Sequence, residues 1–307
     1  MNWNQILEKS WHYLAKRRYL FWLGVLAALT EGGSLYSGGS GYNFSANDIQ
    51  QSEKFDRVLS AITGWLQSHT LEIAIVLIAL FLIGLIILYI SYTARAGLIY
   101  AIHSAEEGEE SNFHRDFEAG KRYFWRFLGL RVLVAITLVL VLIIVILSFV
   151  GAFVLASTYS LWLMIPIALL CIPAIFGFVL LSVYLSLASV LAERAIVIKN
   201  LPIVESIDQA IHLARKNLGS VVLAWLINIV INFVAGIVYT IVLILPVIIM
   251  VALCVASYAI GKTTGLLVSI PLTVLILIVV GVLLQGVFIT YVSAYWTLIY
   301  KKLSADS

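Results

Sequence analysis

The sequence predicts an all-α polytopic membrane protein, a bundle of six transmembrane helices with amphipathic helices at the membrane surface. Of its 307 residues, 62% are hydrophobic and only 11% are charged, against roughly 25% charged residues in a soluble domain. Four long apolar runs carry almost no charge, at residues 71–102, 128–157, 160–192 and 219–300. Because about 20 apolar residues cross a bilayer, the last run holds two spans, divided near Gly261.

The first expected span is the shortest. The apolar stretch Tyr19–Thr30 follows the basic run Lys16-Arg17-Arg18, as the core of a signal peptide would. The residues before it are unusually many and amphipathic, and Ala27–Thr30 offers no clean cleavage site. We therefore expect an uncleaved span that begins near Leu14. The expected spans of a single membrane domain, residues 1–307, are 14–30, 71–95, 128–157, 160–192, 219–255 and 266–300.

A flexible segment rich in Gly and Ser, residues 31–45, follows the first span. Asn47 is a suitable N-cap for the next helix, because Gln50 stands three residues later. Apolar residues then recur at mostly three- and four-residue spacing, among too many charged residues for the hydrocarbon core. We predict that residues 47–68 form a helix lying flat on the outer surface, with Trp65 at the membrane–water interface.

The positive charges fall almost entirely on one side of this arrangement. Six spans place both termini on the same side, and of the 19 Lys and Arg only Lys54, Arg57 and Lys262 lie opposite, which leaves 16. Cytoplasmic loops of membrane proteins carry an excess of Lys and Arg. Both termini and the connections 103–127 and 193–218 are therefore predicted to be cytoplasmic, in a protein of the cell membrane.

Three basic segments on the cytoplasmic side are alike: Leu14–Leu20 before span one, Ala119–Trp125 before span three, and Leu213–Gly219 before span five. Each follows an amphipathic stretch. The pattern indicates a threefold repeat, each unit consisting of an interfacial helix, a basic hinge and a helical hairpin. Convergence explains the pattern as well, because any cytoplasmic helix start favours basic and aromatic residues.

Two of the cytoplasmic connections resemble those of a large group of prokaryotic six-span membrane proteins. They are Asn112–Leu130 (NFHRDFEAGKRYFWRFLGL) and Glu193–Gly219 (ERAIVIKNLPIVESIDQAIHLARKNLG). The group includes the membrane domain that is fused to glycerophosphodiester phosphodiesterases, and the resemblance implies membrane architecture alone. The fused phosphodiesterase is a TIM barrel, which needs about 200 or more residues outside the membrane. This sequence contains no such segment, so the hydrolase activity is not implied.

No catalytic, metal or cofactor site is predicted. Gly261-Lys262-Thr263 matches the end of a phosphate-binding loop, but Ala256 stands where that pattern requires glycine. The acidic run Glu106–Glu110 lacks the alternating ligands of a calcium loop. Cys171 and Cys254 lie in apolar runs and behave as small hydrophobic residues. We expect neither enzymatic activity nor a nucleic-acid partner.

Polar residues inside the spans are the remaining candidates for a site. Asn228 and Asn232 share one face of span five, and Gln285 lies at a matching depth in span six. Side-chain amides bond between membrane helices for about 0.6–2 kcal/mol each. These three residues therefore either join the two helices or line a solute path.

The leading functional hypothesis is a non-enzymatic membrane protein that organises the bilayer or supports a membrane complex. Its expected partners are the lipid bilayer and other membrane proteins, because basic and aromatic interfacial helices bind lipid headgroups. The alternative is a small-solute transporter or channel that uses the face formed by Asn228, Asn232 and Gln285.

Overall fold

The computed structural model describes residues 2–31, 60, 63–159 and 164–305, which form helices joined by short turns, with no strand among them. The all-α prediction is confirmed. The helices are α1 (Trp3–Lys16), α2 (Arg18–Glu31), α4 (Thr70–Glu106), α5 (Phe113–Lys121), α6 (Phe124–Tyr159), α7 (Met164–Ile198), α8 (Ile203–Lys216) and α9 (Leu218–Ala305).

α9 consists of two antiparallel limbs, because residues far apart in its sequence touch. The hydroxyl oxygens of Ser257 and Ser269 lie 2.9 Å apart although the residues are 12 positions apart, a separation of about 18 Å along a straight helix. Toward the other end, the Tyr295 hydroxyl donates a hydrogen bond of 2.9 Å to the Ala224 carbonyl. The limbs, Leu218–Ser257 and Ser269–Ala305, correspond to predicted spans five and six.

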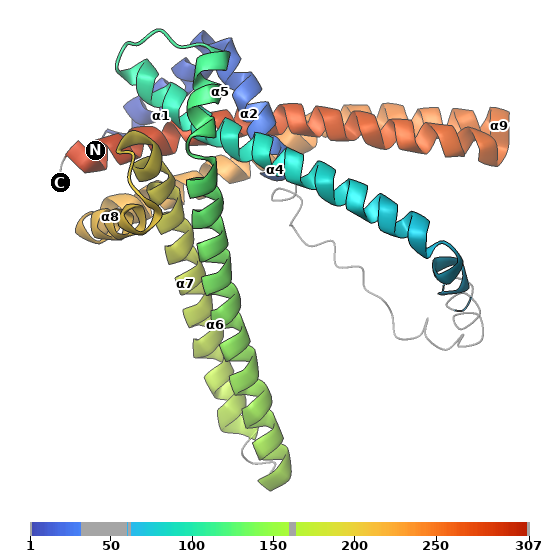
Figure 1. Ribbon diagram of the computed structural model, residues 1–307, viewed down its shortest axis with the longest axis horizontal. Helices are drawn as coiled ribbons and strands as arrows, with labels where there is room; N and C mark the ends of the chain where they lie inside the picture. The colour runs from blue at the N-terminus through green and yellow to red at the C-terminus, as the bar shows by residue number, and fades with distance from the viewer. Residues whose placement is uncertain (1, 32–59, 61–62, 160–163, 306–307) are drawn as a thin grey trace.

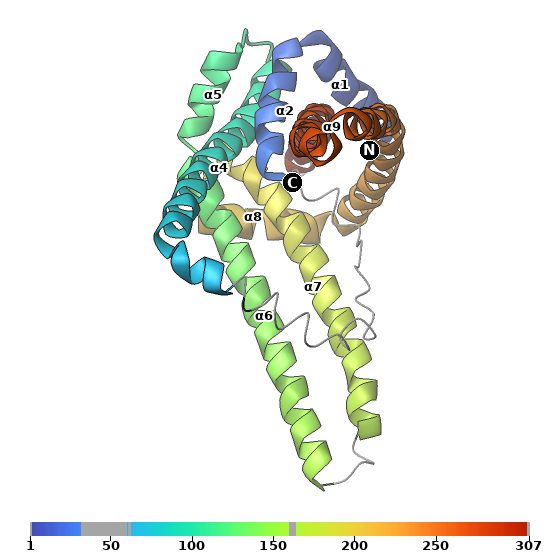
Figure 2. The same ribbon diagram turned by 90° about the vertical axis from the view of Figure 1, so that its right-hand side faces the viewer.

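Three arms leave a common junction (Figure 1). One arm is formed by α6 and α7, the second by the two limbs of α9, and the third by the N-terminal part of α4. Figure 2 shows α9 end-on while α6 and α7 point away from it, so the arms diverge. Their side chains are mostly exposed and apolar, as at Leu71, Phe81 and Leu147. Apolar surface of this extent is unfavourable in water and suits a lipid environment.

Among the described residues, five helical segments are long and apolar enough to span a membrane: α4, parts of α6 and α7, and the two limbs of α9. This is consistent with a multi-pass membrane protein. The remaining predicted span, the first one at 14–30, corresponds to the shorter α2. Leu14 belongs to α1, Arg17 interrupts the helix, and α2 begins at Arg18, four residues later than predicted. Its 14 residues extend about 21 Å, against a hydrocarbon core of about 30 Å.

The helices around the junction extend beyond the predicted spans. α4 continues to Glu106 instead of residue 95, α6 begins at Phe124 instead of 128, and α7 ends at Ile198 instead of 192. These extensions are covered by protein: Leu98 and Phe127, for example, are fully buried. At the other end of α6, the helix continues to Tyr159 instead of the predicted 157, and residues 160–163 lie outside the described part.

The predicted outer helix, 47–68, falls largely on residues outside the described part. Residues 63–68 are helical, and the side chain of Trp65 is exposed. Whether the remainder lies flat on a membrane stays a prediction.

The predicted order of elements recurs three times. The amphipathic helices α1, α5 and α8 each end in a lysine, and the next helix begins after one or two residues, at Arg18, Phe124 and Leu218. These breaks and both chain ends lie at the junction, whereas the reversal of α9 lies at the tip of an arm (Figure 1). The junction therefore places both chain ends at one end of the arms. Its cytoplasmic orientation stays a prediction.

Candidate functional site

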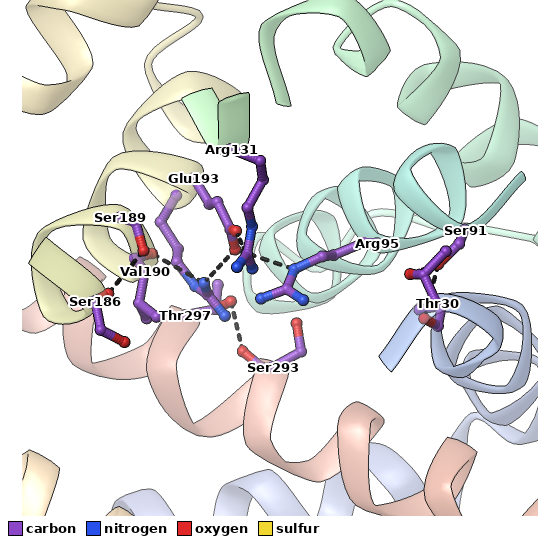
Figure 3. Close-up of polar contacts among 12 residues, drawn as sticks. Thr30, Ser91, Arg95, Arg131, Ser186, Ser189, Val190, Glu193, Ser293 and Thr297 are labelled. Carbon is purple, nitrogen blue, oxygen red and sulfur yellow. Dashed lines mark hydrogen bonds and ion pairs between the residues drawn. The ribbon is translucent and has the colours of Figure 1, made fainter. Parts of the chain in front are cut away.

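The junction encloses four charged residues from three helices, the arginine–glutamate cluster: Arg95 of α4, Arg131 of α6, and Glu193 and Arg194 of α7. The Glu193 side chain has 0% exposed surface. Its Oε2 accepts hydrogen bonds from Arg95 Nε at 3.1 Å and Arg194 Nη1 at 3.0 Å, and its Oε1 lies 2.7 Å from Arg131 Nη2. Figure 3 shows the three guanidinium groups around this one carboxylate. One side chain thus joins α4, α6 and α7.

The arginine–glutamate cluster lies where the arms leave the junction. On α6, Leu130 is fully buried and Val132, two residues later, is 47% exposed. On the facing helices, the small side chains of Ala94, Ala96 and Ala192 are fully buried. Small residues let helix backbones approach closely. Because these alanines occupy little of the space between the helices, the longer charged side chains fit there.

Three guanidinium groups and one carboxylate give these four residues a formal charge of +2. Removing an ion from water costs several kcal/mol, so an enclosed carboxylate needs charged partners. The arginine side chains open progressively toward solvent, with exposed fractions of 3% at Arg194, 16% at Arg95 and 34% at Arg131. Because guanidinium groups occupy both oxygens of Glu193, the carboxylate is poorly placed to accept a substrate proton. The arrangement joins three helices through one enclosed carboxylate.

Polar groups of α9 and α2 lie close to this level. Figure 3 places Ser293 and Thr297 beside the arginine–glutamate cluster. Thr297 Oγ1 donates 2.7 Å to the Ser293 carbonyl, while the buried Ser293 Oγ has no hydrogen-bond partner within the described residues. Thr30 and Ser91 share a hydrogen bond of 2.6 Å that joins α2 to α4. The Thr30–Ser91 contact therefore ties α2 to the α4 arm.

A second buried polar contact lies where α5 crosses α4. A Cβ atom on Gly120 would lie 2.1 Å from the Thr93 carbonyl oxygen, so the two backbones meet directly. Asp116 is buried beside this contact and accepts a hydrogen bond from Ser111. Burial raises the pKa of the Asp116 carboxyl above its ordinary value, and hydrogen bonds from Ser111 and Tyr19 oppose that rise.

The polar residues predicted from the sequence lie on both limbs of α9. Asn232 Nδ2 donates 2.7 Å to the Asn228 carbonyl, one turn earlier on the same limb. Gln285, on the other limb, is 3% exposed. Antiparallel counting places Asn232 opposite residue 287 from the contact of Ala224 with Tyr295, and opposite residue 294 from the contact of Ser257 with Ser269. The matching depth of Asn232 and Gln285 therefore stays a prediction. Within the described residues, the buried Asn228 Oδ1 has no hydrogen-bond partner.

A cavity of about 850 Å³ adjoins Asn232. Residues 232–248 of the first limb supply its lining, mostly with apolar side chains. A hollow lined by one limb is a surface groove rather than a path across the protein.

The arginine–glutamate cluster was not predicted from the sequence. In the sequence, Arg95 and Arg131 fall near the ends of the predicted spans 71–95 and 128–157, and Glu193 and Arg194 fall in the predicted connection 193–218. One feature of the sequence could have indicated that Glu193 and Arg194 are enclosed. The apolar residues Ala195–Val197 follow this charged pair, and α7 continues through them. Among the described residues, no group of three or more His, Cys, Asp or Glu could hold a metal ion.

Comparison with known proteins places the chain in a family but assigns no activity. Residues 8–307 match the model of DUF7544, described as a family of unknown function. The chain belongs to this family. No curated protein and no solved structure matches the chain. The DUF7544 match carries no link to the membrane domain of glycerophosphodiester phosphodiesterases, so the resemblance noted in the sequence extends no further than apolar membrane helices.

Proposed function

We propose that this DUF7544 protein is a non-enzymatic integral membrane protein of the cell membrane that organises anionic lipids around its junction. The observation that carries the proposal is Glu193, whose carboxylate binds arginines of α4, α6 and α7 where the exposed apolar arms begin. With the arms in the bilayer, this level lies near the headgroups. The excess of positive charge there favours anionic headgroups.

The amphipathic helices support the same proposal. α5 and α8 carry the exposed basic residues Lys121, Arg215 and Lys216. Trp11 of α1 and Trp125, at the start of α6, expose 60% and 76% of their surface. Basic and indole side chains of this kind bind at the headgroup level through charge and apolar burial.

Lipid retention tests this function. The protein is reconstituted in nanodiscs with equal amounts of phosphatidylcholine and phosphatidylglycerol, and the lipids that it retains are counted by native mass spectrometry. We expect phosphatidylglycerol to predominate, and a triple variant with Lys121→Gln, Arg215→Gln and Lys216→Gln to retain less of it. The matched control neutralises the three basic residues predicted on the opposite side, Lys54, Arg57 and Lys262.

Equal retention of both lipids by the unaltered protein would contradict the proposal. If a protein partner then copurifies with the chain from native membranes in a stoichiometric amount, the function proposed in place of lipid organisation is the support of a membrane complex.

One observation favours a second candidate, a small-solute transporter. The buried Asn228 Oδ1, which has no hydrogen-bond partner among the described residues, offers a polar atom to a solute on one limb of α9. Flux of a solute into proteoliposomes that depends on Asn228 and Gln285 would support this candidate. Flux that survives both Asn228→Ala and Gln285→Leu would contradict it.

A further inference from the structure

A second positively charged place lies between α1 and the end of α9, apart from the arginine–glutamate cluster. A cavity of about 270 Å³ opens there. Its polar lining is Lys9, Glu106, Lys301 and Lys302, with the amides of Asn2 and Gln5. We propose that this cavity, the lysine cavity, binds the phosphate group of an anionic ligand.

The charges of the lining favour an anion. Three lysines face one glutamate, and that glutamate is already engaged: Lys9 Nζ lies 3.8 Å from its Oε1, and the Tyr13 hydroxyl donates a hydrogen bond to the same oxygen. Lys301 Nζ is 4.0 Å from a Glu107 oxygen, too far for a hydrogen bond, and Lys302 is exposed. Two ammonium groups of α9 therefore remain available at the cavity. An ammonium group binds phosphate as a compact point charge.

The start of α1 adds to this preference. Asn2 is the N-cap, but its side chain makes no capping hydrogen bond, and the first turn contains no acidic residue. The first amide groups of a helix lack partners within the helix and attract anions. Asn2, Gln5 and Ile6 bring this end of α1 to the cavity that the lysines line. The lysines and the cavity carry the inference, and the helix end strengthens it.

A simpler explanation gives both lysines only a structural role: Lys302 in the last turn of α9 stabilises the helix dipole, and Lys301 lies 4.0 Å from the Glu107 carboxylate. That explanation predicts no binding specific to the cavity. The two explanations therefore differ in a measurable way.

The test measures equilibrium binding of radiolabelled inorganic phosphate to the full chain in phosphatidylcholine nanodiscs at constant ionic strength. We expect saturable binding that is weakened about tenfold or more, a free-energy difference of about 1.4 kcal/mol, in the double variant Lys301→Gln and Lys302→Gln. Lys302→Gln alone, at an exposed position, guards against misfolding and should weaken binding in the same direction. The control is Lys199→Gln, which removes an exposed junction lysine outside the cavity.

A second arm of the experiment identifies the source of the phosphate. Nanodiscs that contain phosphatidic acid should displace the labelled phosphate if the ligand is a lipid headgroup. If they do not, the ligand is a soluble phosphate compound. Only this lipid arm rests on the proposed function.

The inference is overturned if phosphate does not bind in either arm, or if Lys199→Gln weakens binding as much as the cavity variants. Retention of phosphatidylglycerol in the lipid assay, together with no binding at the lysine cavity, would leave the proposed function standing. The failures of the two proposals are therefore distinguishable.

Discussion

Replacing Glu193 by Gln should destabilise the junction strongly. The substitution keeps the shape of the side chain and removes the only negative charge among three guanidinium groups within 2.7–3.1 Å. The contact with Arg131 counts least, because that side chain is 34% exposed and is screened by solvent. The enclosed pairs with Arg95 and Arg194 set the magnitude, and breaking a buried pair costs about 3–5 kcal/mol.

Thermal unfolding in detergent measures this loss. Since about 1 kcal/mol shifts the midpoint by roughly 2–4 °C in a larger domain, Glu193→Gln should lower it by on the order of 10 °C. The matched control is Glu118→Gln. Its carboxylate is 56% exposed and pairs with Lys121 at 3.4 Å, so it should change the midpoint by about 2 °C or less.

A further variant tests the reason for the loss. In the double variant Glu193→Gln and Arg194→Gln, one of the three like charges is gone, so part of the lost stability should return. A Glu193→Gln protein as stable as the Glu118→Gln control would refute the view that this carboxylate holds the three helices together.

Three other predictions follow from the described contacts. Gly120→Ala should destabilise the protein by about 1–3 kcal/mol, because its Cβ would collide with α4, whereas Gly84→Ala, with nothing within 4 Å, should be neutral or stabilising. The pKa of Asp116 in the folded protein lies above the ordinary value of an aspartate. The contribution of Asp116 to stability is therefore full below that ordinary pKa and is lost as the pH rises through the folded pKa. Asp116→Asn should flatten this part of the curve of unfolding free energy against pH. With the native cysteines removed, an impermeant thiol reagent on intact cells should label a cysteine at Ser40 and leave one at Glu110 unlabelled, and labelling at Glu110 would reverse the predicted orientation.

The helical architecture could be predicted because a bilayer imposes a pattern on sequence. Long runs without charge have few alternatives to membrane helices. The three amphipathic helices could be predicted from the periodicity of their apolar residues and from the basic residues at their ends. Helix ends were harder to predict. At Glu106 and Ile198 the helices extend past the apolar runs that define a span, because protein rather than lipid covers their final turns.

The candidate site could not be predicted in the same way, because proximity in space decides it. Arg95 and Glu193 are separated by 98 positions, yet they share a hydrogen bond. Each arginine alone has the ordinary features of a helix end, where a long side chain reaches water. Only the convergence of α4, α6 and α7 turns these positions into one enclosed cluster.

Glu193 differs from the arginines, since a short carboxylate side chain cannot reach water from a buried backbone. Residues 188–198 combine apolar side chains with the single charged pair Glu193 and Arg194, and the three residues after the pair, Ala195–Val197, are buried. A glutamate in such a run requires cationic partners from other helices, because an uncompensated carboxylate would cost several kcal/mol. Three Lys and Arg lie within the four apolar runs, and of these Lys262 stands at the division between spans five and six. Arg95 and Arg131 are the other two, and both pair with Glu193. The need of one enclosed carboxylate therefore explains why arginines stand on α4 and α6 at the level where the arms begin.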